Sequence, residues 1–292
     1  MNKKPKFAFF GGEPLAVPVL DALKDANLLP SLIVCNPDRP KGRGQKLTSP
    51  PAKVWAQNNN VPVYQPETYK DESVKEKLSS AGWDLFVVVA YNFILPKWLL
   101  ELPTHGTVNV HPSLLPKLRG ASPIRTAILE NQPENVGVSI MLLDEEMDHG
   151  PILAQTPLPD INKNWPLPGP TLDQLLAELG GKLLAKTIPQ WFKGEIKPQE
   201  QNHNQATYCH KLDKTMAKLE LDPYHLPAGD KAAAALRVIY AFAGLGDAFF
   251  EHKGIRVKIK AAHLDDEKLI IDRVTPAGKK EMSWDSYLQS IG

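Results

Sequence analysis

The stretch Leu85-Phe86-Val87-Val88-Val89-Ala90 decides the fold class of this 292-residue chain, because it contains no polar side chain. A wholly apolar strand is typical of a parallel sheet that helices cover on both faces. Further strands are predicted at 7–10, 32–34, 107–110 and 136–143, and helices at 15–26, 121–130 and 172–192. Strands that alternate with helices predict an α/β fold with a doubly wound, mostly parallel sheet.

The last third of the chain has a different pattern. Residues 194–204 are mostly polar and include Pro198, which is typical of a linker. Beyond them, a helix is predicted at 230–242 and a strand with clean apolar–polar alternation at 254–262. We therefore predict a catalytic domain at 1–193, a linker at 194–205 and a small β-rich C-terminal domain at 206–292.

The bulk composition is that of an ordinary globular protein, with 42% hydrophobic and 23% charged residues. The formal net charge of +1 gives no global sign of nucleic-acid binding, so any such surface must be local. Two cysteines far apart favour a reducing compartment over a disulfide framework. No signal peptide or spanning-length apolar run is recognisable, so the expected location is the cytoplasm.

The run Asn109-Val110-His111-Pro112 carries the chemistry that we expect. Side chains alternate along a strand, so Asn109 and His111 should point the same way. An amide and an imidazole donor together suit a carbonyl oxygen that becomes an oxyanion. Asp148, in Met147-Asp148-His149-Gly150, could hold a charged imidazole in place. From spacing alone, however, such a pair is more often structural than catalytic.

The pattern Asn-x-His-x-Ser-Leu-Leu-Pro-x-x-Arg-Gly, followed by Asp-x-Gly, resembles the formyltransferases that use 10-formyltetrahydrofolate. The resemblance implies that Asn109, His111 and Asp148 are catalytic, and that Ser113, Leu114, Leu115 and Pro116 contact folate. Ligands of open α/β sheets bind beyond the carboxyl ends of strands. Two further loops there supply the remaining candidate folate contacts, which are Tyr91, Asn92, Ile94, Leu143 and Asp144.

Other cofactors are disfavoured. The pair Gly11-Gly12 lacks the glycine spacing of a dinucleotide fingerprint, so a nicotinamide enzyme is not expected. None of the eight histidines forms a His-x-x-x-His pair and the cysteines form no Cys-x-x-Cys pair, so no metal is predicted.

A basic stretch follows the second predicted strand. No acidic residue occurs from Arg39 through Pro66, and on composition alone this is a solvated charged surface. It resembles the loop by which methionyl-tRNA formyltransferases reach the acceptor stem, which implies tRNA contacts from Arg39, Lys41, Arg43 and Lys46. Alternation on the C-terminal strand predicts a second phosphate-binding stripe of Arg256, Lys258 and Lys260.

The resemblance implies formyl transfer from 10-formyltetrahydrofolate to methionyl-initiator tRNA, by a protein that we expect to be a monomer. The alternatives are the same chemistry on a small amine, such as a sugar nucleotide or glycinamide ribonucleotide, and a non-catalytic folate- or RNA-binding protein. The chain departs from the family pattern at His149, Glu13 and Leu15. Residues 262–276 leave room for one strand, so the expected OB-like C-terminal barrel is shorter than usual.

Overall fold

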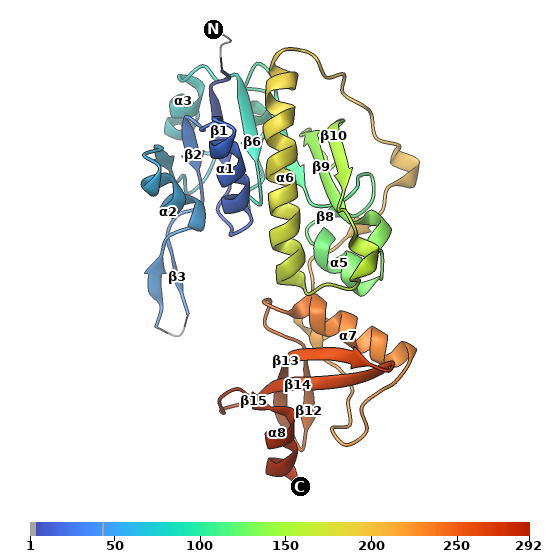
Figure 1. Cartoon of the computed structure of the whole chain (residues 1–292). Helices are drawn as coiled ribbons and strands as arrows, with labels where there is room; N and C mark the ends of the chain where they lie inside the picture. Colours follow the sequence, from blue (N-terminus) through green and yellow to red (C-terminus); the bar gives the residue numbers. More distant parts are fainter. Residues whose placement is uncertain (1–3, 43) are drawn as a thin grey trace. The chain divides into compact units, whose positions relative to one another are not determined.

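Strand β6 (Leu85–Val88) lies inside a seven-stranded sheet with the order β10-β9-β7-β6-β1-β2-β5 (Figure 1). The computed structural model describes residues 4–42 and 44–292, and of Lys41 only the backbone. All four residues of β6 are buried, as expected of a strand that is covered on both faces.

The five strands β5, β2, β1, β6 and β7 run parallel, whereas β9 and β10 continue the sheet antiparallel. The bounds of the six other strands are β1 (Phe7–Phe10), β2 (Leu32–Val34), β5 (Val63–Tyr64), β7 (Thr107–His111), β9 (Gly137–Leu142) and β10 (Ile152–Pro157). The prediction of a doubly wound, mostly parallel sheet is confirmed.

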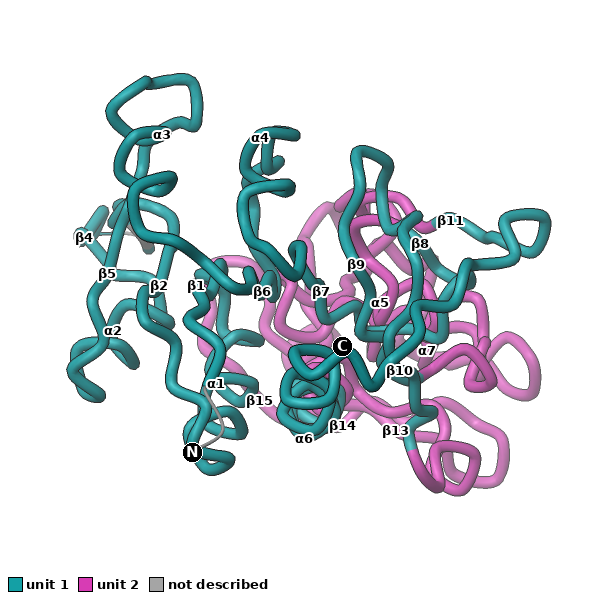
Figure 2. The backbone as a smooth tube through the Cα atoms, turned by 90° about the horizontal axis from the view of Figure 1, so that it is seen from above, with its two compact units in different colours: residues 1–119, 137–158, 174–208 teal, residues 120–136, 159–173, 209–292 magenta. Residues whose placement is uncertain are grey.

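Helices cover both faces of this sheet: Figure 2 shows α1 and α6 on one face, and α3 and α4 on the other. The helices that flank the sheet are α1 (Ala16–Asp25), α2 (Pro51–Asn58), α3 (Glu72–Ser79), α4 (Lys97–Leu100) and α6 (Gly169–Phe192). Helix α6 packs closely against Val110 and Ala22 because Gly180 and Gly181 have no side chain. A Cβ at Gly180 would lie 2.7 Å from Val110 Cγ1, and one at Gly181 would lie 2.7 Å from Ala22 Cβ.

The basic stretch folds into a hairpin between β2 and α2. Its strands are β3 (Arg39–Lys41) and β4 (Lys46–Thr48), which pair antiparallel so that Arg39 lies opposite Thr48. The turn contains Gly42 in the left-handed region, with a φ of 74°. Leu47 is 64% exposed, so the hairpin presents an apolar side chain as well as charges.

The C-terminal part contains a four-stranded antiparallel sheet with the order β12-β13-β14-β15. Its elements are α7 (Asp230–Phe242), β12 (Phe249–His252), β13 (Ile255–Asp265), β14 (Lys268–Pro276), β15 (Met282–Ser283) and α8 (Trp284–Ile291). The prediction of a β-rich C-terminal domain is confirmed. An OB-fold has five strands, so the four strands described here agree with the predicted shortened barrel.

The chain divides into two compact units that are not consecutive in sequence (Figure 2). One contains residues 1–119, 137–158 and 174–208, and the other contains 120–136, 159–173 and 209–292. The second unit thus includes α5 (Pro123–Leu129), which contacts α7. The predicted boundaries at 193 and 205 stay a prediction.

Short elements complete the chain. A two-stranded pair is formed by β8 (Arg119–Gly120) and β11 (Tyr208–Cys209). The single turns of 3-10 helix are η1 (Pro133–Asn135), η2 (Ile161–Lys163), η3 (His203–Gln205) and η4 (Lys214–Ala217). Among residues 4–42 and 44–292, no helix has the length and apolar character needed to span a bilayer.

Candidate active site

Strand β7 carries Asn109 and His111 at the middle of the large sheet. Asn109 lies opposite Val88 of β6 and Met141 of β9, and His111 lies opposite Ser139. The strand runs one residue beyond its predicted end, so both side chains belong to regular strand and share one face. The His111 side chain is 4% exposed and Asn109 is half-buried.

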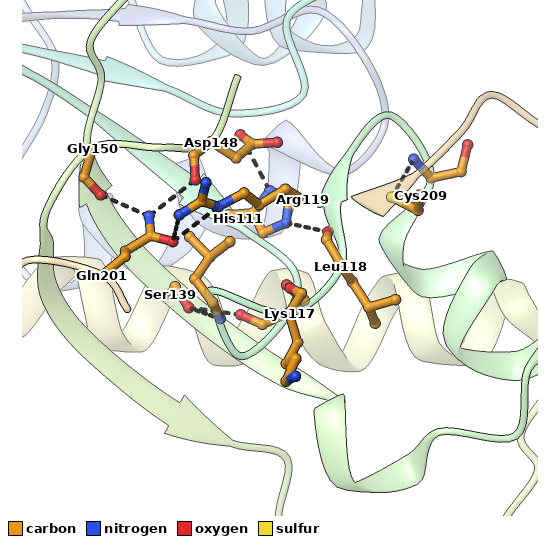
Figure 3. A network of polar contacts seen from close by, with 12 residues as sticks. His111, Lys117, Leu118, Arg119, Ser139, Asp148, Gly150, Gln201 and Cys209 are labelled. Carbon is orange, nitrogen blue, oxygen red and sulfur yellow. Dashed lines mark hydrogen bonds and ion pairs between the residues drawn. The ribbon is translucent and has the colours of Figure 1, made fainter. Parts of the chain in front are cut away.

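The His111 ring is held between two partners on opposite sides (Figure 3). Its Nδ1 lies 3.5 Å from Asp148 Oδ1, and its Nε2 lies 3.0 Å from the carbonyl oxygen of Leu118. A carbonyl oxygen only accepts, so Nε2 bears a proton and Nδ1 is the atom that faces the carboxylate. A ring with an N–H on each nitrogen satisfies both partners at once.

Both partners of His111 have left-handed backbone conformations, with a φ of 58° at Leu118 and 51° at Asp148. For residues other than glycine this conformation costs about 1–3 kcal/mol and persists only where surrounding contacts hold it. Such strain is concentrated at functional sites in proteins. Both partners of His111 thus lie in turns whose backbone conformation surrounding contacts must hold.

A buried polar network lies beside this histidine, and sequence reasoning missed two of its members. Arg119 is 1% exposed, and its Nε and Nη2 donate to Gln201 Oε1 at 3.1 and 2.6 Å. The Gln201 amide donates to the carbonyls of Asp148 and Gly150, at 2.9 and 2.7 Å (Figure 3). His203 accepts from Arg119 Nη2 through its Nδ1, at 2.9 Å. Gln201 and His203 lie in the predicted linker, where no local pattern indicated them.

The loop from Ser113 to Pro116, expected to contact folate, is stiffened by buried contacts. Ser113 is 0% exposed and its hydroxyl donates to the carbonyl of Lys117 at 2.6 Å. Leu115 is 3% exposed, and its N–H donates to Ser139 Oγ at 3.1 Å. The side chains of Leu114 and Pro116 are half-buried, so these two are the ones that reach the surface of the loop.

The loop after β6 supplies the exposed apolar surface of the site. Ile94 is 94% exposed, and Asn92 Nδ2 donates to Glu13 Oε1 at 2.7 Å. Tyr91 and Leu143 both pack against one cluster of buried apolar residues, and the Tyr91 hydroxyl lies 2.6 Å from the Tyr69 hydroxyl. Burial raises the pKa of Tyr91 above the usual range, so its hydroxyl stays neutral.

The turn that carries Asp148 also contains the residue that departs from the family pattern. His149 Nδ1 lies 2.7 Å from Asp144 Oδ2, and its ring stacks on that of His203 at 4.1 Å with an interplanar angle of 8°. Asp144, an expected folate contact, therefore has a partner within its own loop. Within the described ranges, no group of three His, Cys, Asp or Glu side chains could hold a metal ion.

The predicted tRNA-binding residues of the hairpin are exposed where they are described. The Arg39 side chain is 61% exposed and lies 3.3 Å from Glu67, and Lys46 is also exposed. Arg43 lies outside the described residues, and of Lys41 only the backbone is described. At the base of the hairpin, hydrogen bonds from Gln65, Lys53 and Ser49 lower the pKa of Asp38 to about 2.

A pocket of about 160 Å³ lies beyond the carboxyl ends of β1 and β2. Its wall includes Glu13, Asn36, Arg39, Thr48 and Asn92. The hairpin thus supplies two of the lining residues. Asn36 Oδ1 is buried without a hydrogen-bond partner among the described residues, which leaves an acceptor beside the pocket.

The predicted basic stripe on β13 is partly neutralised. Lys260 Nζ lies 2.7 Å from Asp247 Oδ2, and Lys258 Nζ lies 4.0 Å from the same atom. The Arg256 guanidinium lies 3.3 Å from the centre of the Phe249 ring. The stripe therefore presents fewer free charges than its sequence indicates.

Comparisons with known proteins agree with this geometry. The chain matches the domain family described as Formyl transferase over residues 5–184. It is 42% identical over 217 residues to the methionyl-tRNA formyltransferase of Halalkalibacterium halodurans, covering 74% of this chain and 67% of that protein. It is 41% identical over 257 residues to that of Synechococcus sp. (strain JA-2-3B'a(2-13)), covering 87% of this chain and 76% of that protein.

A solved structure shares the fold. The N-formyltransferase of Helicobacter canadensis, in complex with folinic acid and dTDP-3-aminofucose, superposes with a TM-score of 0.63 over 90% of this chain and 89% of its own. The two sequences are 19% identical, so this likeness concerns the fold alone.

Proposed function

The chain belongs to the methionyl-tRNA formyltransferase family, and from that premise we propose that it transfers the formyl group of 10-formyltetrahydrofolate to the α-amino group of methionyl-initiator tRNA. The observation that carries this function is the pairing of His111 with Asp148. His111 lies two residues beyond Asn109 on the same strand of the large sheet. The pairing supports a role for all three side chains in the reaction.

In the mechanism, the folate supplies the formyl group and the amine of the aminoacyl end attacks its carbon. An α-amino group has an ordinary pKa near ~8, so a useful neutral fraction exists at neutral pH. Asn109 donates a hydrogen bond to the oxygen as it becomes negative, and the positive charge of the His111 ring stabilises that oxygen electrostatically, because the two ring N–H groups face Leu118 and Asp148. Asp148 holds that ring and receives the proton that the amine releases, through a water molecule. The leaving folate nitrogen takes up a proton as its bond to carbon breaks.

The loops around His111 fit a folate. An apolar side chain that is 94% exposed, such as Ile94, is suited to a ligand with a flat aromatic ring. The buried Ser113 and Leu115 hold the neighbouring loop rigid, while Leu114 and Pro116 offer apolar surface. Backbone groups of the loop at Leu143 and Asp144 would bind the polar edge of the ring.

The hairpin fits the aminoacyl end of an RNA. Arg39 and Thr48 belong both to the hairpin and to the wall of the pocket beyond β1 and β2, so a substrate that fills this pocket touches the hairpin. Exposed charges at Arg39 and Lys46 suit backbone phosphates. The stripe of Arg256, Lys258 and Lys260 would contribute less, because two of its charges share Asp247.

The second candidate is formyl transfer to a small amine, which the shared fold of the Helicobacter canadensis enzyme favours, since that enzyme was solved in complex with dTDP-3-aminofucose. The hairpin distinguishes the two functions, because a small substrate has no need of it. A non-catalytic binding protein would not need Asn109, His111 and Asp148 together, and the pairing of His111 with Asp148 counts against it.

The deciding experiment is formylation of charged initiator tRNA with 10-formyltetrahydrofolate. We expect turnover that Asn109→Ala and His111→Ala each reduce by about 10²-fold or more without unfolding the protein. Replacing Arg43 and Lys46 by alanine should weaken use of tRNA while leaving folate binding intact. No turnover with tRNA, or unchanged tRNA kinetics in the double variant, would contradict the assignment to tRNA.

We further propose a cytoplasmic monomer. Cys35 and Cys209 are both buried thiols, which agrees with a reducing compartment. Light scattering coupled to gel filtration tests the oligomeric state, and a mass near twice 32.3 kDa would contradict the monomer.

A further inference from the structure

We propose that the segment from Gln199 to Thr207, and Gln201 above all, positions both partners of His111 and so sets the orientation of its ring; this rests on the proposed function. Residues 199–205 of this segment were expected to be part of a linker. Gln201 touches no reacting atom in this proposal. It is a positioning residue that acts through Asp148.

At its first end the segment holds the turn that carries Asp148. The backbone of Gln199 pairs in both directions with Ile152, at 2.8 and 2.9 Å. Gln201 is 5% exposed, and its amide donates to the carbonyls of Asp148 and Gly150 (Figure 3). These two carbonyls flank His149, so the turn is fastened on both sides.

At its other end the segment holds Leu118, the second partner of His111. Thr207 accepts from the N–H of Leu118 through its hydroxyl and from the N–H of Arg119 through its carbonyl, both at 2.9 Å. The Thr207 N–H donates to the carbonyl of Pro116 at 3.2 Å. One short segment therefore fixes the residues on either side of the imidazole.

Arg119 sets the orientation of the Gln201 amide. Both donors of Arg119 that reach Gln201 bind its oxygen, so the NH₂ group must face the carbonyls of Asp148 and Gly150. The hydrogen-bond partners of this amide therefore fix which of its atoms is nitrogen and which is oxygen.

The turns need this support because of their backbone conformations. Leu118 and Asp148 are both left-handed, a conformation that an unsupported residue with a side chain leaves for a lower-energy one. The stacked rings of His149 and His203 add a second contact between the segment and the Asp148 turn. His149 departs from the family pattern, so this second contact depends on a residue outside that pattern.

The test is the substitution Gln201→Glu in the full-length enzyme. The carboxylate still accepts from Arg119, but it has no N–H for the two carbonyls, so the Asp148 turn is released. We expect kcat to fall by about 10²-fold, because a displacement of Asp148 by about 1 Å has an effect of that size. The KM values for tRNA and folate should stay unchanged. The matched control is Gln199→Glu, the same change at an exposed side chain in the same segment, which should behave as wild type.

Gln201→Met provides a second variant without a buried charge. For each variant, thermal unfolding and tetrahydrofolate binding report whether the protein is folded, and the ¹⁵N shifts of the His111 ring report its surroundings. Loss of kcat with altered His111 shifts and retained folate binding supports the proposal. A wild-type kcat overturns it. The proposal is also overturned if both variants lose folate binding and thermal stability together with kcat. An inactive wild-type enzyme would instead contradict the proposed function.

Discussion

Replacing Asp148 by asparagine should slow formyl transfer without disturbing the turn. Asparagine has the same shape, keeps an acceptor oxygen and tolerates a left-handed backbone, which Asp148 adopts at a φ of 51°. The charge that faces His111 Nδ1 at 3.5 Å is removed, and with it the carboxylate that receives the amine proton in the proposed mechanism. The substitution therefore measures what the Asp148 carboxylate contributes to the reaction.

The magnitude follows from the distance and from burial. Unit charges 3.5 Å apart attract by roughly 5 kcal/mol at an effective dielectric constant of about 20. The side chains are 4% and 13% exposed, so solvent screens the pair little. Without the carboxylate the ring is held less firmly in its charged form, and if about half of this attraction is thereby lost from the stabilisation of the oxyanion, the barrier rises by roughly 2–3 kcal/mol and kcat falls by about 10²-fold.

The assay is single-turnover formylation of charged initiator tRNA, with the enzyme in excess. Glu146→Gln is the control, because it removes an exposed carboxylate two positions away in the same loop. We expect the control to behave as wild type and Asp148→Asn to keep its affinity for folate. A rate for Asp148→Asn equal to that of wild type would show that the His111–Asp148 pair has no part in the chemistry.

Three further predictions concern the scaffold. Gly180→Ala should lower the free energy of unfolding by about 1–2 kcal/mol, since overpacking against Val110 exceeds the gain in helix propensity; a raised Tm in calorimetry would contradict it. The pKa of Asp38 is lowered to about 2, so the stability it contributes is present above pH 4 and is lost as pH falls toward 2. Asp38→Asn should therefore reduce the fall in the free energy of unfolding between pH 4 and pH 2, measured by urea unfolding at each pH. An unchanged pH dependence would count against the hydrogen bonds that Asp38 accepts. Burial raises the pKa of Cys35 to about 11, so native protein at pH 8 should resist iodoacetamide at this residue, as peptide mass spectrometry can check.

Local patterns carried much of the fold. The strands Phe7–Phe10 and Leu32–Val34 and the helix Asp230–Phe242 occupy the residues that periodicity predicts. The two strands could be read locally because each is a short, wholly apolar run, and the helix because its buried residues repeat at the helical period. Strand β10, in contrast, has a mixed burial pattern at the sheet edge and was not predicted. The hairpin strands β3 and β4 were likewise read as a loop, because exposed residues carry no burial period.

Local sequence patterns were enough to predict the fold class, the family and the strand that brings Asn109 and His111 to one face, because each pattern is made of residues close together in the chain. The surroundings of His111 could be known only from the folded molecule. Gln201 is 82 residues from Arg119 and 53 from Asp148, and its amide joins them only after the sheet has formed. Contacts at such separation depend on the whole path of the backbone, which no local pattern records.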